Sequence, residues 1–216
     1  ELRGKSWAID GFGALSHHMS RLVVRALNIG EDEIDWQAVG PPPERIARLL
    51  EASIDVSLIR VEEATSLDSD TNNKLHTLLG FAELKDLVPI QPHGVLATTE
   101  AYEQAHPEQM LRLTKGMIRA SRALNDDFEN FRKVYDHHVT VKVDDEKVHD
   151  IWQKERDSGG FAVNGELTNG HWKSQMELFY ELHSELPEIS RGDVIAENFV
   201  ADALNVLGIQ PGQDVA

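Results

Sequence analysis

The 216-residue sequence contains no cysteine, which excludes disulfide bonds, thiolate nucleophiles and cysteine-ligated zinc. No His-Glu-x-x-His or comparable metal-binding spacing occurs, and the adjacent His137 and His138 diverge if they lie on a helix. A Gly-x-Ser-x-Gly nucleophile motif is also missing. The sequence therefore indicates no metal, no cofactor and no catalytic nucleophile of these classes.

Basic residues are scarce, since 21 Lys and Arg stand against 37 Asp and Glu and give a formal charge of −16. Such an excess of negative charge opposes binding to nucleic acid or to an anionic membrane surface, so we expect no nucleic-acid partner. No apolar run approaches the ~18 residues that span a bilayer. Residues 1–5 do not read as a signal peptide.

A strand, a glycine turn and a helix are predicted at the start of the chain, and the other elements are interpreted around them. Residues 6–9 form the strand, Gly11 and Gly13 form the turn, and the helix runs from Ser16 to about residue 27. A helix that begins directly after a strand leaves its first backbone N–H groups unpaired at the carboxyl edge of the sheet. This edge is a receptor for a small anionic or polar group.

Two other interpretations of the turn are open. Gly11, Gly13 and Ser16 fall on the spacing of a dinucleotide fingerprint, but its third glycine is a serine here. The next strand also ends in Gly40 and three prolines, where a ribose-binding site needs an acidic residue. The glycines can otherwise serve only a tight turn, with Ser16 capping the helix.

The first ninety residues predict a parallel α/β sheet. Strands are expected at residues 34–39 and 54–59, and a helix at 44–52 lies between them. The order β-α-β-α-β in one sheet requires parallel strands. The helix is amphipathic, with Ile46, Leu49 and Leu50 on one face and Arg45, Arg48 and Glu51 on the other.

Beyond about residue 90, the sequence predicts mainly helices. A short helix is expected at 61–70 and a strand at 75–82, and a further strand is expected at 95–98. Two prolines, Pro89 and Pro92, lie before this last strand and indicate a crossover between lobes. We therefore predict two parts, an αβ lobe at 1–90 and a crossover strand with a helix-rich remainder at 91–216. Helices are expected at 99–104, 107–125, 128–137, 145–157, 171–184 and 193–207.

Three loops are predicted at the carboxyl edge of the sheet, where open αβ lobes bind ligands: residues 10–17, 40–42 and 60–63. Arg60 is the best side-chain partner for an anion because its guanidinium can bind two oxygens, although a salt bridge to Glu62 or Glu63 explains it equally well. The candidate ligand-binding residues are Phe12, Gly13, Ala14, Leu15, Ser16, His17, Gly40, Arg60 and Glu63, with Gln91 and His93 from the crossover.

The order of several short segments resembles the type II periplasmic binding proteins of ABC importers, in the branch for sulfonate, nitrate, taurine and thiamine-precursor uptake. The matching segments are residues 2–5 (Leu-Arg-Gly-Lys), 11–17, 26–30, 38–40, 54–57, 96–102, 106–108 and 201–208. The resemblance implies a periplasmic-binding-protein-like fold and a substrate-binding component that clamps a small organic anion or heterocycle between two lobes. It also implies a ligand held at the loop of residues 10–17, an ABC permease as partner and a periplasmic or extracytoplasmic location.

One departure from the family pattern bears on these expectations. The Leu-x-Gly-Lys segment opens the second lobe in that family, but here it occupies residues 2–5. The resemblance therefore implies that the first αβ part of lobe one is absent, as a fragment, as a part supplied by another chain or segment, or through remodelling. Two alternatives to transport are an enzyme on the same scaffold, a decarboxylase or thiamine-pyrimidine synthase with His17, His93 and Glu63 in acid–base roles, and a ligand-sensing module.

Overall fold

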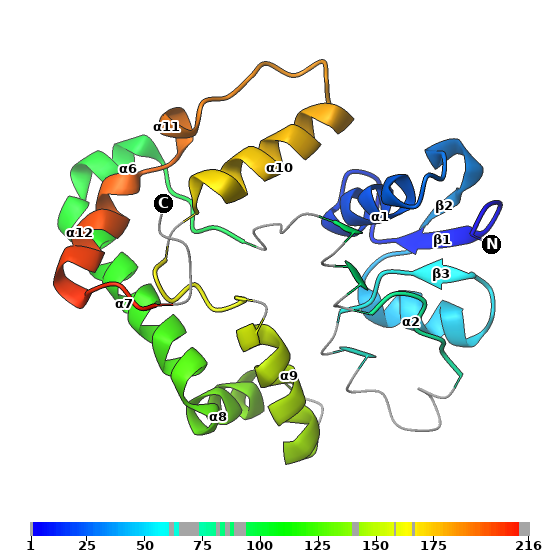
Figure 1. Ribbon diagram of the computed structural model, residues 1–216, viewed down its shortest axis with the longest axis horizontal. Coiled ribbons are helices and arrows are strands. Elements are labelled where there is room, and N and C mark those ends of the chain that lie inside the picture. Colours follow the sequence, from blue (N-terminus) through cyan, green and yellow to red (C-terminus); the bar gives the residue numbers. More distant parts are fainter. Residues whose placement is uncertain are drawn as a thin grey trace. The chain divides into compact units, whose positions relative to one another are not determined.

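The computed structural model describes residues 2–60, 63–64, 74–80, 83–84, 87–88, 94–139, 143–157, 159–165 and 167–211. Contacts between residues divide the chain into two units, Glu1–Pro89 and Ile90–Ala216, whose elements are labelled in Figure 1. The assignment of these parts to the lobes of a binding protein stays a prediction.

The first unit contains a three-stranded parallel sheet, as the sequence predicts. Its strands are β1 (Ser6–Ile9), β2 (Asp35–Ala38) and β3 (Val56–Ser57), in the order β2-β1-β3. The side chains of three consecutive β1 residues, Trp7, Ala8 and Ile9, are all buried, as expected for a central strand that is covered on both faces. The strand β3 is shorter than the predicted 54–59.

Two helices and a short 3-10 helix connect these strands. Helix α1 (Leu15–Ala26) and η1 (Glu31–Glu33) lie between β1 and β2, and α2 (Pro42–Leu50) lies between β2 and β3. The first connection leads to one side of β1 and the second to the other side, so right-handed crossovers place α1 and α2 on opposite faces of the sheet. This reversal creates a topological switch point between the carboxyl ends of β1 and β3.

The amino ends of β1 and β3 are joined by Ser6 and Asp55. The Asp55 carboxylate accepts hydrogen bonds from the Ser6 N–H (2.9 Å) and the Ser6 hydroxyl (2.8 Å), and the Asp55 N–H donates to Ser6 Oγ (2.9 Å). These bonds to Ser6 lower the pKa of Asp55 below its ordinary 3.8, and Lys5 acts in the same direction. The interaction therefore stabilises the fold at pH values above 3.8 and is lost as the pH falls.

Two predicted strands are wrong where the structure describes them. Residues 75–80, from the strand predicted at 75–82, and residues 95–98 contain no strand. Val95 and Leu96 are 66% and 61% exposed. Their apolar and β-branched residues suit a strand, but a strand requires a neighbour for its backbone hydrogen bonds, and the described residues supply none. Most of the predicted helix 61–70 lies outside the described residues, as do Gln91 and His93.

In the described part of the second unit, the regular elements are helices. They are α6 (Glu100–Ala105), α7 (Pro107–Asp126), α8 (Phe128–His138), α9 (Asp145–Asp157), α10 (Asn169–Leu182), α11 (Arg191–Val194) and α12 (Glu197–Leu207). The single helix predicted at 193–207 is divided into α11 and α12, because Ile195 has an extended backbone (φ −108°, ψ 117°) that interrupts the helix. None of the described helices is both long and apolar enough to cross a bilayer.

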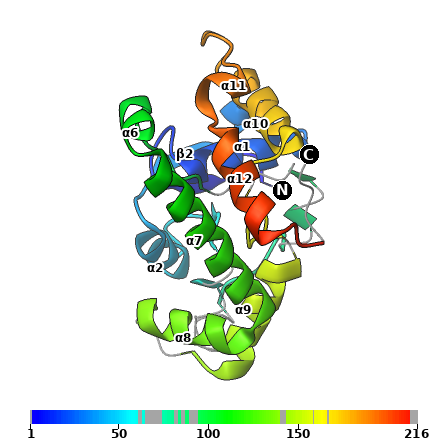
Figure 2. The same ribbon diagram turned by 90° about the vertical axis from the view of Figure 1, so that its left-hand side faces the viewer.

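Helix α12 packs along α7, and Figure 2 shows the two helices side by side as in Figure 1. Ile118 of α7 is 1% exposed and packs with Ala203 and Leu204 of α12. The apolar residues Leu113 and Met117 of α7 are instead exposed. The buried face of α7 is thus set by α12 and not by the apolar periodicity of α7 alone.

The Arg122 side chain joins α7 to two distant segments. Its guanidinium donates to the carbonyl oxygens of Val163 (2.7 Å), Leu207 (3.1 Å) and Gly208 (2.6 Å), and to Asn164 Oδ1 (3.3 Å). The buried Asn164 amide also pairs with the Gln210 backbone, accepting from its N–H (3.0 Å) and donating to its carbonyl (3.1 Å). The bonds from Arg122 to Leu207 and Gly208 occupy carbonyl groups at the end of α12, which have no partner within the helix.

Candidate functional site

The loop after β1 turns tightly and delivers the chain into α1. Gly13 has a positive φ of 80°, and the Ala14 N–H donates to the Gly11 carbonyl (3.1 Å). Helix α1 begins at Leu15, and its N-cap residue, Ala14, provides no side-chain cap. The first N–H groups of α1 therefore lie at the carboxyl edge of the sheet without a capping side chain, as the sequence predicts.

Ser16 does not cap this helix, so the capping interpretation is wrong. It lies inside α1, is buried, and its hydroxyl oxygen accepts a hydrogen bond from the Asp10 N–H (2.8 Å). This bond fixes the start of the glycine-containing loop, at Asp10, to the first residues of α1. Ser16 thus shapes the loop from inside the protein.

Replacing Gly13 by alanine is expected to destabilise the αβ unit by about 1–2 kcal/mol, because an alanine at a positive φ is strained. No atom would lie within 4 Å of the new Cβ, so the cost comes from the backbone alone. Gly11→Ala is the matched control: it is also uncrowded, its φ is not positive, and it should be neutral or slightly stabilising. Urea unfolding of both variants measures the difference, and equal stabilities would contradict this account of the turn.

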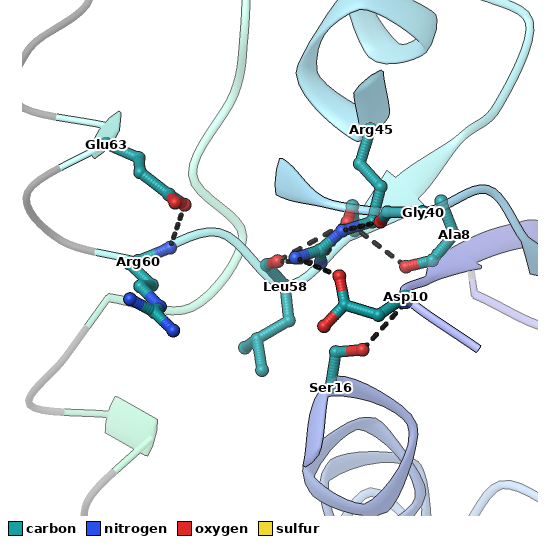
Figure 3. Close-up of polar contacts among 9 residues, drawn as sticks. Ala8, Asp10, Ser16, Gly40, Arg45, Leu58, Arg60 and Glu63 are labelled. Carbon is teal, nitrogen blue, oxygen red and sulfur yellow. Dashed lines mark hydrogen bonds and ion pairs between the residues drawn. The ribbon is translucent and has the colours of Figure 1, made fainter. Parts of the chain in front are cut away.

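Arg45 of α2 ties together the carboxyl ends of all three strands (Figure 3). Its side chain forms an ion pair with Asp10 after β1 (Nη2 to Oδ1, 3.1 Å) and donates to the Gly40 carbonyl after β2 (3.1 Å). It also donates to Ser57 Oγ (3.2 Å) and to the Leu58 carbonyl (2.6 Å) at the end of β3. Arg45 is only 3% exposed.

The placement of Arg45 on the solvent face of its helix is therefore wrong. Helical periodicity assigns an arginine to the outside, but the strand ends offer it carbonyl groups and one carboxylate, which satisfy a buried guanidinium. One signal was present in the sequence. Arg45 lies in the first turn of α2, where a positive charge opposes the helix dipole and so indicates a specific partner.

His17 lies in a small aromatic cluster beside the turn. Its ring centroid is 5.3 Å from that of Phe12 and 5.3 Å from that of Trp36, with edge-to-face geometry in both pairs. His17 Nδ1 accepts a hydrogen bond from the Gly13 N–H (3.1 Å). Burial, and then the positive charge of Arg21, lower the pKa of His17 below 6.5, while Glu31 raises it.

The outward surface of the loop is apolar. Phe12 is 68% exposed and Leu15 is 50% exposed, directly beside the uncapped start of α1. Apolar side chains next to backbone donors suit a ligand that has an anionic or polar head and an apolar body.

Arg60 and Glu63 follow β3 at the same edge of the sheet (Figure 3). Arg60 is exposed, and its backbone N–H donates to Glu63 Oε2 (3.1 Å). Gly40 differs from these residues, because its N–H donates to the Ile9 carbonyl (3.3 Å) and its own carbonyl accepts from Arg45. The polar groups of the Gly40 backbone therefore serve the architecture of the edge.

The structure thus brings together the loop residues Phe12 to His17, Gly40, Arg60 and Glu63 at one edge. Across the described ranges, no group of three or more His, Asp or Glu residues is arranged to hold a metal ion. Among the described residues at this edge, the backbone amides at the start of α1 and the exposed Arg60 are donors that suit the binding of an anion.

Comparisons of the chain with protein-family models, with curated proteins and with solved structures found no significant match.

Proposed function

We propose that this chain is a solute-binding protein, the substrate-binding component of an ABC-type importer, with a fold like that of type II periplasmic binding proteins. Its ligand is a small organic anion or heterocycle. The proposal includes a permease as partner and an extracytoplasmic location, both of which rest on the sequence resemblance.

The observation that carries the proposal is the arrangement of loops at the carboxyl ends of the strands, beside the topological switch point. The order β2-β1-β3 places the loops after β1 and β3 on either side of this point, where open parallel sheets bind ligands. The loop after β1 contributes the uncapped α1 N-terminus, and the loop after β3 contributes Arg60. Arg45 and Asp10 neutralise each other beneath the edge, so an anion does not meet an isolated carboxylate there.

Ligand binding is tested by thermal unfolding of the whole chain with methanesulfonate, taurine, nitrate, aromatic carboxylates and pyrimidines. A ligand at 100 times its dissociation constant stabilises the protein by about 2.7 kcal/mol. Arg60→Ala should weaken binding of an anion about tenfold, which corresponds to about 1.4 kcal/mol. Arg48→Ala, at an exposed position of α2, should leave the affinity unchanged.

Leu15→Glu separates binding from stability. A carboxylate in the first turn of α1 favours the helix through its dipole, so the variant should fold at least as well as the parent. The same charge repels an anionic ligand from the helix start, whereas Leu15→Gln should affect binding much less. A folded chain to which none of the compounds binds contradicts the proposed function, and conversion of a compound to product favours the enzyme alternative.

A further inference from the structure

We propose that His17 is a pH-sensitive latch on the turn at residues 11–14: its neutral ring holds the turn closed, and protonation releases it. The latch is a property of the turn itself. Its consequence for ligand binding rests on the proposed function.

The hydrogen bond between Gly13 and His17 requires a neutral ring. Because Nδ1 accepts from the Gly13 N–H (3.1 Å), the single proton of the neutral imidazole must be on Nε2. Protonation adds a hydrogen to Nδ1, so two donors then face each other. The bond to Gly13 breaks, and the turn loses its contact with α1 at that point.

The ring cannot take up a proton and remain in place without affecting the turn. Trp36 limits movement of the His17 ring on one side, because Trp36 is itself held in place. Its Nε1–H donates to the Glu31 carbonyl (3.0 Å), and its ring centroid lies 5.7 Å from that of Trp7. On the other side the ring contacts Phe12, which belongs to the turn. A displaced imidazolium therefore moves Phe12 and Gly13 together.

The charges around His17 favour the latched form near neutral pH. Arg21, one turn further along α1, disfavours the imidazolium, and Glu31 of η1 favours it. These two residues form an ion pair with each other (Nε to Oε2, 2.6 Å), and Asp10, directly before the turn, is paired with Arg45. The neighbour from β2, Trp36, is uncharged.

The direction of the pH effect follows from the pKa. The pKa of His17 lies below 6.5 in the closed form, so the open form binds more protons. The latch is therefore fully effective above pH 6.5 and is lost as the pH falls through the lowered pKa.

Release of the latch changes what the loop offers to a ligand. In the latched form the Gly13 N–H is occupied by His17, whereas after protonation both this N–H and the imidazolium are donors beside the start of α1. An anion should consequently bind more tightly at low pH. A neutral heterocycle gains no charge attraction from the imidazolium and should respond less.

The latch is tested by NMR titration of the full chain between about pH 8 and pH 5. At pH 8 the His17 ring nitrogens should show the Nε2–H tautomer. The Gly13 amide resonance should shift with the same midpoint, below 6.5, as the His17 ring, and its protection from exchange should fall roughly fivefold once corrected for intrinsic rates. A Gly13 amide that does not follow the titration of His17, or a ring protonated on Nδ1 at pH 8, would overturn the proposal.

Two variants serve as controls. His17→Gln should abolish the titration of the Gly13 amide. His149→Gln should leave it unchanged, although His149 lies in a comparable aromatic setting between Phe128 (4.8 Å) and Trp152 (5.4 Å). Loss of the Gly13 transition in His149→Gln would show that a general pH effect, and not the latch, moves the turn.

The effect on ligands is measured with methanesulfonate, which stays an anion throughout the titration. Its dissociation constant should be roughly fivefold lower at about pH 5.5 than at pH 8 in the parent, and independent of pH in His17→Gln. Equal affinities at both pH values in the parent would refute the regulatory role. Absence of binding at both, with the Gly13 transition intact, would count against the proposed function and leave the latch supported.

Discussion

Arg45→Met is expected to destabilise the αβ unit by about 3 kcal/mol. Methionine fills much of the volume of the arginine stem but removes every donor. The Gly40 and Leu58 carbonyls then lose their arginine donor at a buried site, and Asp10 loses its counter-charge. The loss should also loosen the carboxyl edge, because Arg45 contacts the end of each of the three strands.

Urea unfolding followed through the indole N–H resonances of Trp7 and Trp36 reports on this unit, since both residues belong to its sheet. Arg48→Met is the matched control and should change stability by less than about 0.5 kcal/mol, because Arg48 is exposed on the same helix. Arg45→Lys should recover only part of the loss, since an ammonium cannot reach acceptors on three strand ends in the geometry of a guanidinium. Equal midpoints for Arg45→Met and Arg48→Met would contradict the role given to Arg45.

Arg122→Met is expected to destabilise the helical unit by about 2–4 kcal/mol. The guanidinium supplies hydrogen bonds to the last carbonyls of α12 and to Val163, and its positive charge lies at the negative end of the α12 dipole. Loss of these bonds weakens the contact of α7 with both segments at once.

Unfolding of this variant is followed through the indole of Trp152, whose Nε1–H donates to the Leu124 carbonyl at the end of α7 (2.7 Å). Arg119→Met, at an exposed position of the same helix, provides the control and should be nearly neutral. A second comparison uses Asn164→Asp, which keeps an acceptor for Gln210 and Arg122 but loses the amide donor to the Gln210 carbonyl. If Arg122→Met and Arg119→Met unfold together, the proposed contribution of Arg122 is wrong.

The parallel sheet and the loop after β1 could be predicted because both follow from local sequence. Trp7 to Ile9 are a short apolar run, and Gly13 lies just before the N-cap residue of α1, so strand, turn and helix were recognisable within about twenty residues. Most predicted helices in the second half agree with the structure to within about two residues at each end, because helical periodicity is also a local property.

The remaining features depend on partners that are distant in sequence. Arg45 is buried because strand ends 35 residues before it and 12 to 13 residues after it supply a carboxylate, a hydroxyl and a carbonyl. Periodicity predicts an exposed arginine, since it considers only the helix itself. The strand predicted at residues 95–98 was wrong for a related reason. The composition of this segment favours a strand, but strand formation also requires a neighbouring strand.

The link between Arg122 and its partners also determines when each part of the chain can fold during synthesis. Ile118 and Arg122 of α7 have partners at residues 163–164 and 203–208, so α7 is made well before the segments that cover it. The sheet differs, because the described backbone pairings of β1, β2 and β3 lie within residues 4–60 and can form while the rest of the chain is still being translated. A chain whose synthesis ends between residues 126 and 203 therefore contains all three strands and α7 but lacks the α12 residues that cover α7, and such an exposed apolar face favours aggregation.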